Sequence, residues 1–247
     1  MEITSATRPG HGHGRSAELV LTGGHFAALL DVGGATPYEG EGGGEGPSGP
    51  ASRVSGRVGG SEGGHDIDAG SAARALGGRL ADGLLRQEQV PLSLLLREAL
   101  RDLPLERRTP ARVLVPSPPP GPPGEPPATA VAVVRERGDF LDLLVLGDAA
   151  VVLQFPDRTV NVVRGGPRAP LAHPQAAGRT VVGSLASRDV RRVCLLTGAA
   201  HELAVRSNAG WPRLLERLAE AGPGALVAGA PYASATVALC TPGRVRG

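Results

Sequence analysis

Two aspartates that each end an apolar run beside glycine are the first candidates for chemistry in this sequence. Asp31 closes the stretch "ALLD" and Asp148 closes "LLVLGD". A carboxylate at the end of a strand can reach a hard cation, which takes several oxygen ligands, and a neighbouring glycine lets a backbone carbonyl join them. By spacing alone, an aspartate in an ordinary turn is the simpler interpretation. The choice between the two depends on whether the chain supplies further ligands.

Three other motifs match known patterns but lack the structural context that gives the patterns meaning. Residues 59–63 satisfy G-x-S-x-G, but no strand is predicted before them and no helix directly after them. Residues 44–49 satisfy G-x-G-x-x-G inside the same glycine-rich tract, where composition alone produces such a match. His11 and His13 could ligate a metal, but no third and fourth ligand accompany them. We interpret all three as features of loops.

Composition excludes several classes of function. The 247 residues carry 26 basic and 24 acidic side chains, a formal net charge of +2, and only 2% are aromatic. Nucleic-acid binding needs a basic field and aromatic stacking faces, so we expect no nucleic-acid partner. The chain contains arginine but no lysine, which excludes a lysine-containing phosphate-binding loop, a Schiff-base enzyme and a lysine-dependent kinase. Its Arg, Ala, Gly and Pro bias is typical of a GC-rich bacterial genome.

The cysteines and the hydropathy pattern bear on location. Cys194 and Cys240 form no C-x-x-C motif and are predicted to be buried, reduced thiols. No apolar run approaches the roughly 18 residues of a membrane-spanning helix, and the N-terminus lacks a basic stretch followed by an apolar one. We therefore expect a soluble, cytoplasmic protein without membrane contact.

Hydrophobic periodicity predicts an α+β fold. Two strands are expected at Glu18–Thr22 and His25–Asp31, joined by Gly23 and Gly24. A central antiparallel meander is expected from "TAVAVVRER" to "TVNVVR", followed by strands at Val193–Thr197 and Ala233–Cys240. Helices are expected at Ser71–Arg86, from Pro91 to Leu103, and at Trp211–Glu220. The continuous Leu and Val content of residues 146–155 favours a place in a central sheet, covered on both faces. No βαβ alternation suggests a parallel sheet.

Two low-complexity segments flank the first helical section. Residues 38–70 are dominated by Gly, Ser, Glu and Pro and are predicted to be a disordered insertion, because they contain too little apolar surface to pack. Residues 116–127 form a Pro-rich loop.

In this order the segments resemble the metal-dependent protein phosphatases of the type 2C (PPM) family, in particular its short actinobacterial members. The resemblance lies in "GRSAELV", "ALLDVGGATP", "PPATAVAVVRERG", "LDLLVLGDAAVVL", "DVRRVCLLTGAAHEL" and "YASATVALC". These correspond to the family's E-D strand, D-G turn, T-V strand, G-D-S strand, S-D-G strand and C-terminal acidic strand. The resemblance implies one domain over residues 1–247, an antiparallel β-sandwich flanked by helical layers.

In that family two divalent metals held by aspartates activate a bridging water, which attacks phosphoserine or phosphothreonine. The resemblance implies that Glu18 and Asp31 are the remnant of the metal site, and that Gly147 and Asp148 belong to the scaffold. If the remnant site binds a metal, that metal is expected to be Mg²⁺ or Mn²⁺.

Several family positions that should be acidic hold other residues. Leu19 stands where the first metal aspartate belongs, Gly198 replaces the aspartate of S-D-G, and Ala233 and Ser234 occupy the C-terminal acidic positions. In addition, Val32 replaces the glycine that follows the bridging aspartate. Losing these carboxylates removes the charge that neutralises two cations, so the metal motifs are predicted to be degenerate.

Three hypotheses about function remain open at this point. The first is a catalytically degenerate pseudophosphatase with a binding or regulatory role, whose partner would be a phosphoprotein or a regulatory protein. The second is an active, divergent Mg/Mn-dependent phosphatase with substitute ligands such as Glu39, Asp66 or Asp68. The third is a structural or partner-binding β-sandwich that shares only its architecture with phosphatases.

Overall fold

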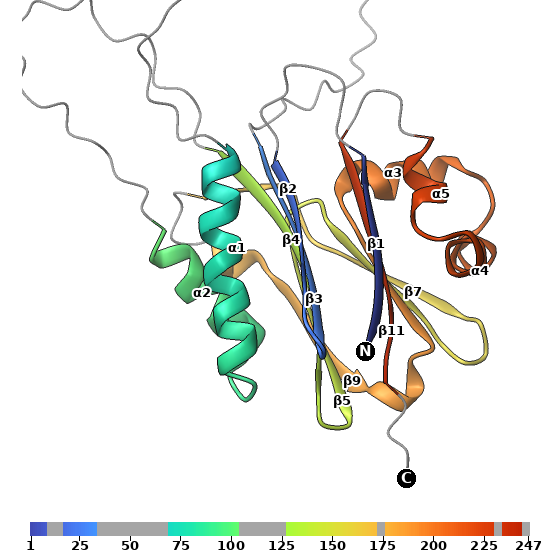
Figure 1. Ribbon diagram of the computed structural model, residues 1–247, viewed down its shortest axis with the longest axis horizontal. Coiled ribbons are helices and arrows are strands. Elements are labelled where there is room, and N and C mark those ends of the chain that lie inside the picture. The colour runs from blue at the N-terminus through green and yellow to red at the C-terminus, as the bar shows by residue number, and fades with distance from the viewer. Residues whose placement is uncertain (9–16, 34–68, 104–126, 172–175, 230–233, 244–247) are drawn as a thin grey trace, which may run out of the picture.

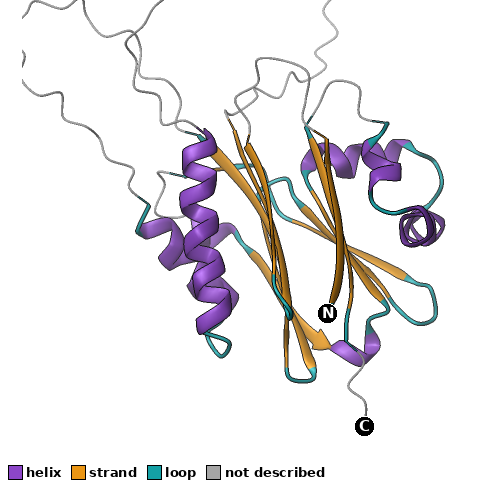
Figure 2. Cartoon of the chain, viewed as in Figure 1, coloured by secondary structure: helices purple, strands orange, loops and turns teal. Residues whose placement is uncertain are grey.

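Two antiparallel β-sheets packed face to face, with helices on both outer sides, form the fold (Figure 1, Figure 2). The computed structural model describes residues 1–8, 17–33, 69–103, 127–171, 176–229 and 234–243. The strands are β1 (Glu2–Arg8), β2 (Ala17–Thr22), β3 (Phe26–Gly33), β4 (Ala128–Arg137), β5 (Phe140–Leu146), β6 (Ala150–Gln154), β7 (Val160–Arg164), β8 (Ala169–Pro170), β9 (Val181–Ala186), β10 (Arg192–Leu196) and β11 (Ala235–Thr241). The helices are α1 (Ala69–Arg86), α2 (Leu92–Arg101), α3 (Gly198–Arg206), α4 (Trp211–Ala221) and α5 (Gly224–Val227), with 3₁₀ turns η1 (Ala176–Arg179) and η2 (Ser187–Asp189).

Some strands that follow one another in the sequence lie in different sheets. Sheet A has the order β1-β11-β10-β6-β7, and sheet B has the order β2-β3-β4-β5-β9 with β8 paired to β4. The predicted α+β sandwich with helical layers is confirmed. One part of the prediction is wrong: the central meander is not one sheet, because β4 and β5 lie in sheet B whereas β6 and β7 lie in sheet A. Residues 146–155 therefore cross from one sheet to the other.

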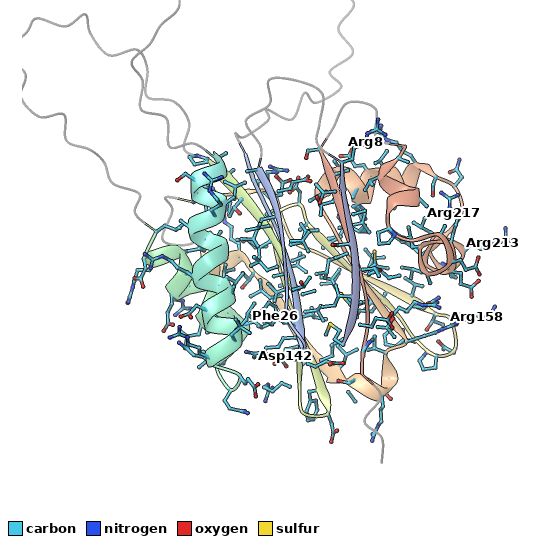
Figure 3. The ribbon with its side chains drawn as sticks, viewed as in Figure 1. Arg8, Phe26, Asp142, Arg158, Arg213 and Arg217 are labelled. Atoms are coloured by element: carbon cyan, nitrogen blue, oxygen red, sulfur yellow. The ribbon has the colours of Figure 1, made fainter. Side chains whose placement is uncertain are left out.

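The core consists of three apolar layers built almost entirely from Leu, Val and Ala. Side chains such as Leu29, Val134, Val151 and Leu195 fill the space between the sheets. Since side chains alternate along a strand, Phe26 points from β3 to the opposite side and packs under α1 (Figure 3). A third cluster lies between sheet A and helices α3, α4 and α5.

Sequence patterns located most of these elements. The two-glycine hairpin is present as β2 and β3 in antiparallel register, and α1 buries Leu76, Leu80 and Leu84 as its helical period predicts. The sequence patterns did not indicate the strands β1, β8 and β9 or the helices α3 and α5. The predicted insertion at 38–70 extends into α1 by two residues, since Ala69 and Gly70 are helical. Residues 38–68, and all of the Pro-rich loop except Pro127, lie outside the described residues.

A buried arginine attaches the helical layer to sheet B. Arg135 on β4 is 0% exposed and donates to the carbonyl oxygens of Val90 at 2.9 Å and Gln87 at 3.4 Å, in the connection between α1 and α2. Its guanidinium also donates to Asp142 at 3.1 Å. An arginine can satisfy several acceptors at once because it presents five N–H donors in a rigid plane.

None of the helices in the described part of the chain combines the length and the apolar content that a membrane crossing needs.

Replacing Val151 with Asp is expected to abolish folding. Val151 is 0% exposed between the sheets, where an unpaired carboxylate costs at least about 4 kcal/mol, a large part of the stability of a domain. The measurement is the yield of soluble protein and its urea unfolding curve. The matched control is Val182→Asp on β9, because Val182 is 56% exposed and the same change there should leave folding intact. A folded Val151→Asp variant would show that this layer is not the core.

Candidate functional site

The predicted acidic pair lies side by side at one end of the sandwich. Glu18 on β2 is the direct cross-strand partner of Asp31 on β3, so both side chains lie on the same face of sheet B. That face is turned toward sheet A, because Leu29, two residues before Asp31, belongs to the layer between the sheets. Asp31 is 3% exposed. This end of the sandwich is the one at which β3 stops at Gly33 (Figure 1).

An arginine that the sequence analysis did not single out occupies the centre of this site. Arg168 donates to Asp31 through two nitrogens, Nη2 in a short contact and Nη1 at 3.4 Å. Its Nε lies 3.2 and 3.1 Å from the two carboxylate oxygens of Asp148. One guanidinium therefore joins two aspartates that are far apart in the sequence. Such charge-assisted contacts are the strong class of hydrogen bonds.

The chain places Arg168 there by crossing between the sheets. After β7 in sheet A the backbone runs to β8, whose Ala169 pairs with Thr129 on β4 of sheet B. Asp31 pairs with Ala130, the next residue of the same strand. Arg168 immediately precedes β8, so its side chain begins next to the inward-facing Asp31.

Glycines bring Asp148 into the same cluster. Gly147 adopts φ +71°, and a Cβ there would lie 2.8 Å from the carbonyl oxygen of Thr129. A side chain at Gly147 would thus be strained twice, by its backbone angle and by this contact. A Cβ at Gly198, which the resemblance aligned with the S-D-G aspartate, would overlap the Asp148 carboxylate. Asp148 therefore fills the space beside Gly198 and shares a cation with Asp31.

Burial alters the ionisation of these groups. The pKa of Glu18 is raised to about 7, chiefly by burial; a short hydrogen bond from Thr236 Oγ1 opposes the rise, and the nearby Asp31 charge adds to it. Burial also raises the pKa of Asp31, against the effect of the Arg168 charge. Burial lowers the pKa of Arg168, but the charges of Asp31 and Asp148 outweigh this and raise it. Arg168 is therefore a permanent cation, while Glu18 is partly protonated near neutral pH.

These donors do not fit a centre for two divalent cations. Metal-ligating carboxylates must be ionised and free to coordinate, whereas both aspartates already bind a guanidinium. No group of three or more His, Cys, Asp or Glu side chains able to hold a metal ion occurs among the described residues. The candidate substitute ligands Glu39, Asp66 and Asp68, together with His11, His13 and Ala233, lie outside the described residues.

Comparison with known proteins identifies the fold. No protein-family model matches the sequence, and no curated protein sequence matches it significantly. Solved structures do match over nearly the whole chain. The PPM Ser-Thr phosphatase MsPP from Mycobacterium smegmatis aligns at 13% identity, covering 98% of this chain and 99% of that one, with a TM-score of 0.52. The chain has the type 2C phosphatase fold.

Two further structures illustrate the range of proteins with this fold. The catalytic domain of the serine threonine protein phosphatase PstP, in complex with two manganese ions, aligns at 13% identity over 96% of both chains, with a TM-score of 0.55. A chain from a structure of the bacterial stressosome aligns at 12% identity over 96% of this chain and 97% of that one, with a TM-score of 0.52. At such identities the likeness extends to the fold and not to the site residues.

Removing the Arg168 charge is expected to destabilise the fold. In Arg168→Met, two largely inward-facing aspartates lose their counter-ion, and we expect a loss of about 2–3 kcal/mol, below the roughly 3–5 kcal/mol of a fully buried pair because Arg168 and Asp148 retain some solvent contact. Urea denaturation measures this. Adding Asp31→Asn to Arg168→Met should recover part of the loss, because it removes one of the uncompensated charges. Equal stability of Arg168→Met and the unmodified chain would contradict the placement of this guanidinium.

The raised pKa of Glu18 predicts a specific dependence of stability on pH. Because the folded protein holds a proton that the unfolded chain releases, stability is highest below the unfolded pKa of 4.5 and decreases as pH rises to about 7. Glu18→Gln should remove this decrease and make the protein more stable at pH 8 by roughly 1–2 kcal/mol relative to the unmodified chain, a modest value because Glu18 as a residue is only half-buried. At pH 4 the two proteins should differ little. Unfolding curves at both pH values test this, and a difference that is the same at both would contradict it.

Proposed function

We propose that this chain is a binding or regulatory module with the type 2C phosphatase fold that does not catalyse two-metal phosphate hydrolysis. The observation that supports the proposal is the position of Arg168, whose guanidinium binds Asp31 and Asp148 together. An internal cation neutralises carboxylates that would otherwise be available to an external one.

A guanidinium cannot replace the catalytic contribution of a divalent ion. A metal with an open coordination position lowers the pKa of bound water to about 7 and so supplies a nucleophile. Arg168 carries a single positive charge and offers only N–H donors, without a vacant coordination position. With Arg168 in place, Asp31 and Asp148 hold a hydrogen-bonded structural cluster and leave no position for an activated water between metals.

Loss of catalysis is compatible with retention of a binding surface. A fold of this kind on which a phosphoprotein or regulatory partner docks requires a stable sandwich but no metal site. A chain from the bacterial stressosome, a modular system that has been adapted to control secondary messenger signaling, shares the fold. Our proposal includes a single domain over residues 1–247, a cytoplasmic location and a bacterial, actinobacterial-type origin.

The proposal predicts no saturable binding of Mn²⁺ in isothermal titration calorimetry and no Mn²⁺-dependent hydrolysis of p-nitrophenyl phosphate or phosphopeptides above a buffer control. The reason is that ionised, unpaired carboxylates are too few to hold two cations. An established two-metal phosphatase assayed in parallel controls for the assay.

Metal-dependent turnover that disappears in Asp31→Ala would overturn the proposal and favour an active enzyme with ligands from Glu39, Asp66 or Asp68. Turnover that persists in Asp31→Ala would not arise at this site.

A further inference from the structure

The strand β9 forms one edge of sheet B and leaves a row of backbone groups open to solvent. It pairs with β5 on one side, and none of the described strands pairs with its other side (Figure 1). Residues 181–184 are exposed. Such an edge presents N–H and C=O groups that form a template for a further strand.

The register with β5 determines which backbone groups of β9 point outward. In an antiparallel ladder, pairs of residues that exchange hydrogen bonds alternate with pairs that do not. The amide of Ser187 donates to the carbonyl oxygen of Asp139 at 2.8 Å, and these two residues continue the β5–β9 ladder by one pair. By alternation, Val182, Ser184 and Ala186 direct their N–H and C=O groups away from β5.

The strand β9 also differs from the other sheet edges in its lack of charge. Its sequence is VVGSLA, and the uncharged run extends from Thr180 to Ser187. The strands at the other three edges each contain a charged residue: Glu2 and Arg8 in β1, Glu18 in β2 and Arg164 in β7. Charged side chains on an edge strand are a common protection against pairing with another chain. This protection is missing at β9.

Exposed apolar side chains lie at the same edge. On β9, Val182 is 56% exposed and Val181 is 40% exposed, and Phe140 on the adjacent β5 is 50% exposed. Val182 is the cross-strand partner of Leu144, which packs under the helices, and Phe140 is the partner of Ala186. Val182 and Phe140 therefore lie on the outer face of sheet B. Exposed apolar side chains that are grouped, unlike single ones, mark an interaction surface.

We propose that β9 is a dimerisation edge, at which two copies of this chain pair their β9 strands antiparallel about a two-fold axis through Ser184. The outward backbone groups of Val182, Ser184 and Ala186 must face one another for the two strands to exchange hydrogen bonds. A register centred on Ser184 meets this condition, because it sets Val182 of each copy opposite Ala186 of the other. The same patch then serves both copies, as two-fold symmetry requires.

This register also covers the exposed apolar side chains. Ala186 lies beside Phe140 within one copy, so Val182 of the other copy extends the row on the outer face. Two-fold symmetry produces this row twice. A register shifted so that Val182 faces Ser184 lacks it.

The distribution of charge favours a second copy as the occupant. Pairing a charged strand with itself brings like charges together, whereas β9 has no charged residue. Beyond the strand, the antiparallel direction brings Arg179 of one copy to the end at which the other copy carries Asp139, Arg188 and Asp189, all of them exposed. Each end thus holds two basic and two acidic side chains. The inference does not depend on the role of Arg168.

Sedimentation velocity of the full chain over a series of concentrations tests the proposal. We expect a reversible equilibrium between monomer and dimer, since one strand edge is a small interface. Hydrogen exchange of the unmodified chain at high and low concentration locates the contact, and amides of β9 should exchange more slowly in the dimer. A monomer at every concentration, assemblies larger than a dimer, or a dimer in which β9 gains no protection would overturn the proposal.

Variants test the register. Val182→Asp should raise the dissociation constant of the dimer by about tenfold or more, because each dimer contains the change twice and each carboxylate loses water. The matched control is Val205→Asp on α3, since Val205 is also 56% exposed, and it should dimerise like the unmodified chain. Adding Ala186→Arg to Val182→Asp should restore the dimer, because opposite charges then face each other across the two-fold axis.

Circular dichroism verifies that each variant is folded, and the exchange measurement tests the interface without any substitution. Equal effects of Val182→Asp and Val205→Asp, or a double variant that dimerises no better than Val182→Asp alone, would contradict the pairing of β9 in this register.

Discussion

The packing of two sheets face to face imposes a charge problem at the end where Asp31 lies. Along most of the sandwich the inward positions are filled by Leu, Val and Ala, which need no partner. At this end they are filled by Glu18, Asp31 and Thr236, so acidic groups face each other in a space of low dielectric. Like charges in such surroundings are costly unless a cation is present or a proton is retained. The structure uses both solutions: Arg168 binds Asp31, and burial keeps Glu18 partly protonated.

The position of that cation depends on the path of the chain. Close approach between backbones is possible at Gly147 and at Gly165, where a Cβ would meet the backbone of residue 147. These contacts hold the turn that carries Asp148 against the segment that carries Arg168. The path of the backbone therefore determines which carboxylates Arg168 contacts. The crossing from sheet A to sheet B positions this arginine, and it joins Asp31 on sheet B to Asp148 in the turn between β5 and β6.

Local patterns predicted the elements that bury a regular apolar face, and they failed where pairing is long-range. The spacing of Leu76, Leu80 and Leu84 identified α1, and Gly23 with Gly24 identified the first hairpin. By contrast, β1 is largely polar and half-exposed, and it is a strand because it pairs with β11 at the far end of the chain. The segments β5 and β6 look like one meander because the turn between them is short. Nothing in their composition indicates that they enter different sheets.

The residues of the candidate site likewise fall into some that the sequence pattern indicated and one that it did not. Glu18 and Asp31 were predictable because each occupies a position in a recognisable order of motifs, and their pairing follows from the hairpin register. Arg168 had no such signal, because it lies in a segment rich in Gly and Pro and its partners are 137 and 20 residues away. The one available clue was that the sequence predicts buried carboxylates without enough partners to balance their charge. Buried carboxylates without their family ligands need a cation, and arginine is the only permanently charged basic side chain that this sequence contains.

A guanidinium and a divalent metal ion give the end of the sandwich at Asp31 different chemical properties. A divalent ion is exchangeable, and when bound it polarises water, so a site built around it is chemically active but empties when the metal is removed. An arginine is covalently part of the chain and cannot dissociate, so Asp31 and Asp148 keep this shared cation as long as the protein is folded.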